Sequence, residues 1–543
     1  MRRIFIALLV TIILPLTTAA NNRKGVGCWR TQSAFHQAAA RLQQGREAAA
    51  RQQYRIPGTE QPRYFEGTKR GLIILAEFTD TKFNKNNSRE KYISILNEPG
   101  YTTIEGFRGS VADYFKDQSA GMFDLEFDVV GPYTASHNAK YYGSNDDDGY
   151  DERPHELIIE MCKAADADVD YHDYDWDGDG EAEEVFVIYA GKSEADTDRP
   201  DLIWPHMWTL TEAGTGKLML DSIDIDIYAC ANELMTGGRI NGIGTICHEF
   251  SHCMGFPDFY DLNYSGEFGM GSFDIMSSGN YAGNSFCPVG YTAYEKMMCG
   301  WITPIELSDT DVTVDSLRPM SEHGDAYIIY NDAYPDEYYL IENRQKTGWD
   351  KSYPAKGLLI SHVDYDAELW EYNIPNTILS QIDAIEFWDI PIGNDHQRMT
   401  LFHADNEDDT RYWNPRGGYY TKTTGSTDLY PYQNRDSLTA TSTPAAELFH
   451  KNSEGTKLLQ GAILDIKENG DHTMSFRYRA KTPIPDAIRH IDSDSRSQHI
   501  YTLDGRRVHS ESAQFRSAPD RKQGRNYPLK KGIYIVDGKK VVF

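Results

Sequence analysis

The segment His-Glu-Phe-Ser-His, at residues 248–252, places the strongest constraint on how this chain folds. Residues four apart lie on one face of a helix, so the imidazoles of His248 and His252 can reach one metal ion. Glu249 projects from the same turn and can activate a metal-bound water. The preceding residues 243–247 are apolar at helical spacing. The sequence therefore predicts a buried helix that carries a metal site.

Two residues after this helix extend the motif. Gly255 allows a sharp turn, and Asp258 follows the first histidine by ten residues, where metzincins place their third zinc ligand. A catalytic zinc ion takes three protein ligands and keeps one position for water, so two histidines and one aspartate complete the set. The alternative, an amphipathic helix with two solvated histidines, is far less compatible with the extended motif.

A second metal site is indicated upstream. Carboxylates stand at every second position of 175–179, and Gly178 and Gly180 permit a tight loop, as at the start of a calcium loop. Phe186 stands where an EF-hand has its final glutamate, so we predict a calcium-loop-like site, with a solvated acidic turn as the alternative. The candidate ligands are Asp175, Asp177, Asp179, Glu183 and Glu184.

Other candidates lie downstream of the zinc motif. Met276, within residues 272–279, fits the Met-turn that supports zinc ligands in metzincins. Tyr281 is a candidate to stabilise the oxyanion. His206 is expected to pack or to line a groove, and His362 and Asp364 to form a structural hydrogen bond within a sheet.

The N-terminus predicts export. The chain begins with basic residues, continues with an apolar run over residues 4–16 and then has small residues up to Ala20. This pattern predicts a cleaved signal peptide at residues 1–20. The apolar run is too short to span a membrane. The net charge of −28 argues against nucleic acid as a partner, because phosphate binding needs a basic surface. We expect a secreted or surface-attached protein, and a monomer.

The remaining chain divides into segments that differ in composition and in their expected secondary structure. Residues 21–66 are polar and read as a pro-segment. In residues 67–305, we expect strands at 123–127 and 185–191, a helix capped by Ser110 and a helix over 155–165. Together with the zinc motif, this alternation predicts an α/β, metzincin-like catalytic domain with a twisted sheet and the active-site helix. Residues 306–480 predict a mostly β domain. Residues 481–543, with 13 Lys/Arg against 7 Asp/Glu, contain two strand-like stretches, at 500–508 and 532–541, and predict a small β domain.

Seven cysteines are present, an odd number for an exported protein. Cys28 lies in the predicted pro-segment, and its removal would leave six. Cys28 is either a fortuitous thiol, which we favour, or a thiolate that caps zinc in a zymogen.

The combined pattern resembles the immune-inhibitor-A-like family of secreted bacterial metallopeptidases, within the metzincins. The resemblance rests on residues 248–261 and is supported by residues 110–114, 175–191, 276–279, 340–344 and 357–364. It covers about residues 68–480. The last 60 or so residues resemble a type IX secretion sorting signal, which implies contact with bacterial secretion machinery and passage across an outer membrane.

This resemblance implies a zinc-dependent endopeptidase that acts on extracellular proteins and is stabilised by calcium. By carry-over, His248, His252 and Asp258 are zinc ligands and Glu249 is the general base. Two alternatives remain. One is a thermolysin-like peptidase with Glu267 or Glu295 as third ligand, and the other is a surface adhesin that keeps the metal-bound fold without turnover.

Overall fold

The computed structural model describes residues 65–480, except 147, 148, 264, 265, 267, 389 and 415–417, together with four short C-terminal strands. The predicted signal peptide, Cys28 and nearly all of the predicted pro-segment lie outside the described residues. Among those described, no helix has the length and apolarity to cross a bilayer.

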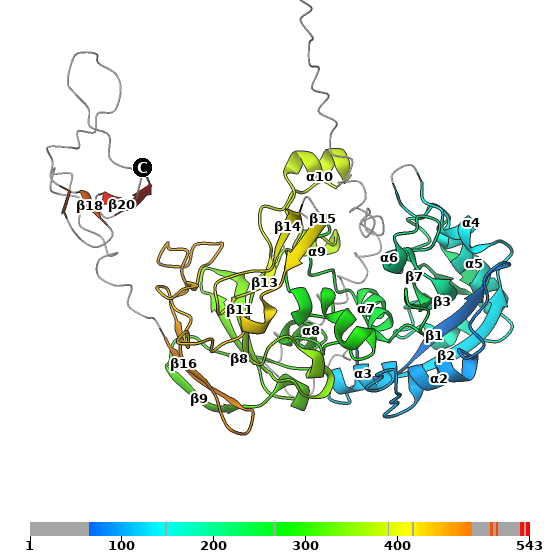
Figure 1. The fold of residues 1–543 in the computed structure, drawn as a ribbon, viewed down its shortest axis with the longest axis horizontal. Helices are drawn as coiled ribbons and strands as arrows, with labels where there is room; N and C mark the ends of the chain where they lie inside the picture. Colours follow the sequence, from blue (N-terminus) through cyan, green and yellow to red (C-terminus); the bar gives the residue numbers. More distant parts are fainter. Residues whose placement is uncertain are drawn as a thin grey trace, which may run out of the picture.

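A five-stranded sheet organises the first half of the chain, in the order β2-β1-β3-β7-β4 (Figure 1). Its first four strands are parallel, and β4 at the edge runs antiparallel to β7. The strands are β1 Gly67–Glu77, β2 Phe123–Thr134, β3 Val185–Lys192, β4 His206–Thr209 and β7 Ile227–Leu234, with a separate hairpin of β5 Leu218–Leu220 and β6 Ile223–Ile225.

Helices cover both faces of this sheet, because its central strands are apolar on both sides. In β1, Ile73 and Leu75 belong to the core that includes α3 and α7, whereas Leu72 and Ile74 face the core that includes α5. The helices of this half are α2 Arg89–Asn97, α3 Val111–Gln118, α4 Ala139–Gly143, α5 Pro154–Ala165, α6 Glu194–Thr197, α7 Gly244–Cys253 and α8 Ala293–Met298.

Several elements form where the sequence predicts them. Ser110 caps α3 through a capping box with Asp113, which fixes the first turn of that helix. The predicted helix at 155–165 is α5, and the runs at 123–127 and 185–191 are β2 and β3. The prediction of a mixed α/β fold is confirmed.

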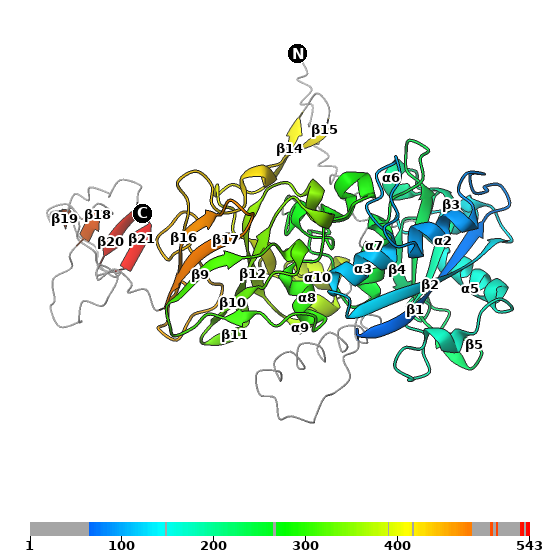
Figure 2. The ribbon, with the colours of Figure 1, turned by 90° about the horizontal axis from the view of Figure 1, so that it is seen from below.

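The second half is mostly β, with a five-stranded sheet in the order β13-β12-β11-β10-β8 and a three-stranded sheet in the order β16-β17-β9 (Figure 2). The strands are β8 Ile305–Glu306, β9 Val312–Leu317, β10 Tyr327–Asn331, β11 Tyr334–Arg344, β12 Gly357–Asp364, β13 Met399–Leu401, β16 Ala462–Glu468 and β17 Met474–Arg479. A hairpin of β14 Thr410–Asn414 and β15 Gly418–Lys422 and two helices, α9 Ala367–Glu371 and α10 Gln381–Phe387, complete it.

The apolar core continues from the first half into the second. In β11, Leu340 lies in the same cluster as α7, while its neighbours Tyr339 and Ile341 pack toward β9, β16 and β17. The larger sheet therefore serves two cores, one on each face. Residue 305, the predicted end of the catalytic domain, lies at the start of a strand of this shared sheet.

Beyond residue 480, the structure describes β18 Ile500–Thr502, β19 Arg507–Val508, β20 Ile533–Val536 and β21 Lys539–Val542. They form one sheet in the order β19-β18-β20-β21. Both predicted strand-like stretches of the tail thus fold as antiparallel pairs.

Candidate metal centre and active site

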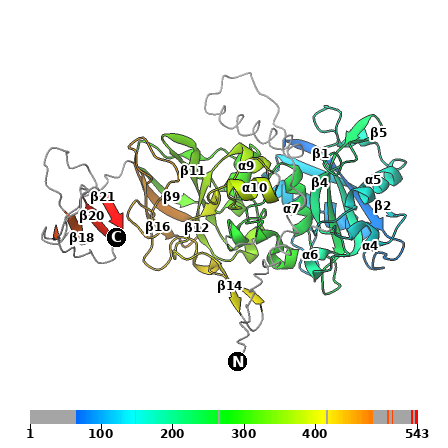
Figure 3. The same ribbon diagram turned by 90° about the horizontal axis from the view of Figure 1, so that it is seen from above.

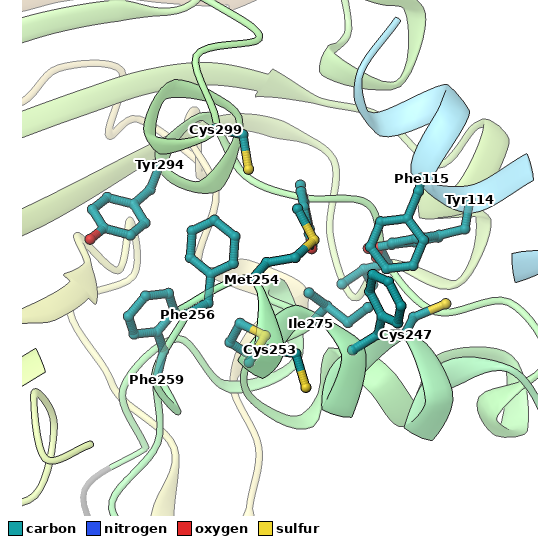
Figure 4. Close-up of a cluster of buried hydrophobic side chains, with 14 of the residues drawn as sticks. Tyr114, Phe115, Cys247, Cys253, Met254, Phe256, Phe259, Ile275, Tyr294 and Cys299 are labelled. Atoms are coloured by element: carbon teal, nitrogen blue, oxygen red, sulfur yellow. The ribbon is translucent and has the colours of Figure 1, made fainter. Parts of the chain in front are cut away.

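Helix α7 carries the motif and is buried along its whole length. Phe250 packs against Phe115 of α3, with ring centroids 5.0 Å apart, and against Phe127 of β2 at 5.8 Å. Figure 4 shows Cys247 and Ile275 in the same apolar cluster as Tyr114 and Phe115. This packing holds the helix against the sheet and directs its polar face toward a cavity.

Gly255 ends the helix as the sequence predicts. Its φ of 99° is a conformation that favours glycine, and its N–H donates to the carbonyl of His252 at 2.7 Å. The chain then reverses so that Asp258 returns to the two histidines.

Three potential ligand atoms converge at this point. The Nε2 atoms of His248 and His252 lie 3.1 Å apart, and Oδ1 of Asp258 lies 3.3 Å and 3.4 Å from them. Metal–ligand bonds of 2.0–2.2 Å in a tetrahedron require ligand separations of about 3.3–3.6 Å. The spacing therefore fits three ligands of one zinc ion.

Hydrogen bonds orient these ligands. Nδ1 of His248 donates to the carbonyl of Ile275, and Nδ1 of His252 to that of Phe256, both at 2.7 Å. We assign the tautomer accordingly, with the Nε2 lone pairs facing each other. Oδ1 of Asp258 is buried and has no hydrogen-bond donor. A buried carboxylate oxygen facing two lone pairs is costly without a cation, so these residues fit a metal ion.

The charges within the site are strongly coupled. Although burial opposes ionisation, His248 and His252 would hold the pKa of Asp258 below its usual range when their rings carry a proton on Nε2 in place of a metal ion. Burial raises the pKa of Glu249, and His248 and His252 partly offset that rise. Glu249 also lies close enough to both histidines to approach the same ion. Asp258 completes the triangle of potential ligand atoms, and Glu249 lies beside it.

A cavity of about 440 Å³ opens beside these residues. Its lining includes Pro205, His206 and Met207 around the start of edge strand β4, together with Glu249 and Tyr281. Tyr281 also lines the cavity, and burial of its hydroxyl raises the pKa of that group to about 12, so the hydroxyl stays protonated near pH 7. His206 lines the cavity as predicted, and burial lowers its pKa to about 4, so its ring is neutral near pH 7.

Met276 is buried in the segment beneath the histidines. Its carbonyl accepts from the N–H of Phe259 at 2.7 Å, and the carbonyl of the neighbouring Ile275 holds His248. The backbone carbonyls of residues 275–276 thus brace both the helix and the return loop, and the Met-turn role of Met276 stays a prediction.

The alternative ligand Glu295 has another role. Its carboxylate accepts from the backbone N–H of Thr292 at 2.8 Å in the capping box of α8. Asp258 rather than Glu295 lies at the histidines, which disfavours the thermolysin-like alternative. Glu267 lies outside the described residues.

The acidic loop before β3 forms a second candidate metal site. Carboxylate oxygens of Asp175, Asp177 and Glu183 lie within 4.8 Å of one another. Asp179 is exposed outside this group, and its Oδ1 accepts from the N–H of Glu181 at 2.9 Å. The structure thus gathers three of the five predicted calcium ligands.

Glu184 is placed elsewhere. Side chains alternate at the start of β3, so Glu184 points away from the loop and contacts Cys253 on α7, near Glu249. Both of its carboxylate oxygens are buried without a hydrogen-bond donor that satisfies normal geometry, and burial raises its pKa well above the usual value. As a predicted calcium ligand Glu184 is corrected to a core residue beside the active-site helix.

His362 and Asp364 are structural, as expected. Nε2 of His362 lies 2.9 Å from Oε1 of Glu337 on the paired strand β11. Asp364 meets Arg398 at 2.6 Å and His396 at 2.9 Å. Although burial opposes it, these neighbours lower the pKa of Asp364.

The six described cysteines are all buried free thiols: Cys162, Cys230, Cys247, Cys253, Cys287 and Cys299.

The fold and this site together define a metallopeptidase catalytic domain. Residues 68–300 match the family described as immune inhibitor A peptidase M6, catalytic domain. The resemblance read from the sequence is therefore supported over this segment, which is a metalloendopeptidase domain.

Two curated relatives agree. Immune inhibitor A of Bacillus thuringiensis subsp. alesti is 25% identical over 298 residues, 44% of this chain and 41% of the relative. Pre-pro-metalloprotease PrtV of Vibrio cholerae serotype O1 (strain M66-2) is 26% identical over 315 residues, 46% of this chain and 34% of the relative. The match thus spans less than half of either relative.

Asn373, which the sequence did not reveal, also belongs to this site. It follows α9 in the β-rich half, 115 residues beyond Asp258, and its amide contacts that carboxylate. No local motif marks it.

Proposed function

We propose that this protein is a secreted, zinc-dependent endopeptidase that cleaves extracellular proteins. The proposal rests on one observation, the close triangle formed by His248, His252 and Asp258. One oxygen of Asp258 in this triangle is buried and accepts no hydrogen bond. When bound, zinc polarises the scissile carbonyl and lowers the pKa of the attacking water.

Glu249 handles the proton. Its carboxylate lines the cavity beside the ligand triangle, and burial raises its pKa toward the range in which a group both accepts and returns a proton. Glu249 accepts a proton from the attacking water and passes it to the leaving amine. Tyr281 lines the same cavity, which supports its hydroxyl as the donor to the developing oxyanion.

Edge strand β4 supports a peptide substrate. Within the part of the chain that the structure describes, β4 pairs only with β7, and its first residues line the cavity. An extended peptide can hydrogen-bond to such an edge and place one carbonyl at the metal. Substrates are therefore protein or peptide segments in extended conformation.

Calcium is proposed at Asp175, Asp177 and Glu183. Three carboxylates within 4.8 Å repel one another unless a cation lies between them. Trp176 between the two aspartates packs toward Phe250 of the zinc helix, with ring centroids 6.3 Å apart. An ordered loop thereby supports α7.

The order of segments supports export and maturation. We propose a signal peptide at 1–20, a pro-segment at 21–66 and a sorting domain at 481–543 that directs the protein to secretion machinery. The name of the Vibrio relative describes pre- and pro-segments for that protein. A monomer remains our expectation, and zymography would decide between the enzyme and the adhesin alternative.

The test uses the purified chain with Glu249→Gln as its partner variant. Wild type should bind one zinc ion at the histidines and cleave casein. The variant should retain zinc but lose cleavage by several orders of magnitude, because only the proton acceptor is removed. Undiminished cleavage by the variant would reject the assignment of Glu249.

A further inference from the structure

Asn373 makes a two-point contact with the third metal ligand. Its Oδ1 accepts from the backbone N–H of Asp258 at 2.5 Å, and its Nδ2 donates to Oδ2 of Asp258 at 2.8 Å. Both residues are buried. One side chain thus fixes the backbone and the carboxylate of Asp258 together.

Because of this contact, the two oxygens of the Asp258 carboxylate have different partners. Oδ2 is occupied by the Asn373 amide, so Oδ1 is the oxygen that faces the histidines. Without the amide, the carboxylate can rotate about its terminal bond and present either oxygen, or both. Residues that orient metal ligands in this way change metal affinity about 10–100-fold when replaced.

Asn373 itself is held in place by its own turn. Its φ of 57° lies in the left-handed region, which asparagine adopts more readily than most residues, and its N–H donates to the carbonyl of Trp370 at 3.1 Å. The turn follows α9 (Figure 3), and Trp370 of that helix packs toward Phe259, with ring centroids 6.3 Å apart. The position of the Asn373 side-chain amide is therefore fixed by the fold and does not depend on a bound metal ion.

The surrounding loop is clamped by the same segment. Oγ1 of Thr377 accepts from the N–H of Leu262 at 2.9 Å, and Nδ2 of Asn376 donates to the carbonyl of Phe259 at 2.9 Å. Neither contact reaches Asp258. Asn376 therefore holds the loop in place, whereas Asn373 orients the metal ligand Asp258.

We propose that Asn373 is a positioning residue for the metal centre, so that the β-rich half completes the active site. The proposal rests on the zinc function proposed above. It also places a determinant of metal affinity beyond residues 68–300, the segment that matches the peptidase family.

Paired variants of the full chain test this assignment. Asn373→Asp keeps the acceptor and the backbone preference but replaces the amide donor with an anion. Asn373→Gly removes the side chain and tolerates the positive φ. Asn376→Asp and Asn376→Gly are the matched controls, since Asn376 is equally buried and only three residues away.

The readouts are zinc affinity, from competition with a chromophoric chelator, and the visible spectrum after cobalt substitution, which reports ligand geometry. Both Asn373 variants should bind zinc 10–100-fold more weakly than wild type and show an altered cobalt spectrum. The Asn376 controls should remain within about threefold of wild type and keep its spectrum, even where their melting temperature falls.

The proposal would be overturned if the Asn373 variants had the same zinc affinity and the same cobalt spectrum as the Asn376 controls. It would also fail if neither Asn373 variant folds while both controls do, because the residue would then serve the fold. Wild type that binds no zinc would instead reject the proposed function itself, so the two failures are distinguishable.

Discussion

Replacing Asp177 with asparagine should separate the cost of crowding three carboxylates from the benefit of the calcium ion that we propose they bind. Asp177 contributes one backbone hydrogen bond, from the N–H of Asp179 at 3.1 Å, so the substitution changes charge more than shape. Asp175, in contrast, accepts from three backbone N–H groups and also shapes the loop.

The magnitudes follow from the spacing. Two unit charges 4.8 Å apart repel by about 0.9 kcal/mol at the dielectric constant of water, before salt screening. Asp177→Asn relieves two such pairs, so after screening the calcium-free protein should gain about 1 kcal/mol. Calcium at 100 times its Kd stabilises wild type by about 2.7 kcal/mol, and a tenfold weaker Kd reduces this gain to about 1.4 kcal/mol.

The assay compares thermal unfolding in a calcium chelator and in excess calcium. In chelator the variant should melt slightly above wild type, and its calcium-induced shift should be about half as large. Asp179→Asn is the matched control, because it removes the same charge from the same loop but lies outside the converging group. An equal calcium shift in wild type and Asp177→Asn would refute the site.

Three further outcomes are expected. Asp364→Asn should destabilise the fold by about 3 kcal/mol at pH 7, because it removes the buried carboxylate that Arg398 meets at 2.6 Å. The pKa of Asp364 is lowered on folding, so its stabilisation is present above about pH 3.8 and is lost as pH falls through the folded-state pKa. Chemical unfolding of variant and wild type should therefore converge in acid, and a constant difference down to pH 2 would contradict this. Gly244→Ala should cost about 1–3 kcal/mol in the same assay, because its Cβ would lie 1.9 Å from the carbonyl oxygen of Asn280; unchanged stability would contradict that packing. Tyr281→Phe should lower kcat for peptide cleavage about 100-fold while zinc content stays constant, and an unchanged kcat would remove Tyr281 from the site.

The sequence predicts those parts of the molecule whose signal is local. Apolar periodicity located α5, β2 and β3, and the cap at Ser110 located the start of α3. The metal motif placed Asp258 because ligand spacing after a fixed helix is itself a local constraint.

Other features depend on contacts between distant segments. Glu183 and Glu184 are chemically alike in the sequence, but the alternation of side chains at the start of β3 directs one to the acidic loop and the other to α7. Asn373 meets Asp258 only after the two halves pack together, and nothing near it in the chain indicates that contact. The shared core across residue 305 has the same origin.

Zinc K-edge X-ray absorption of the purified protein, loaded with one equivalent of zinc, tests the metal centre most directly. The account predicts nitrogen and oxygen ligands at about 2.0–2.2 Å, with the multiple scattering of two imidazoles. Sulfur at about 2.3 Å, from Cys247 or Cys253 beside the histidines, would contradict the assignment of His248, His252 and Asp258.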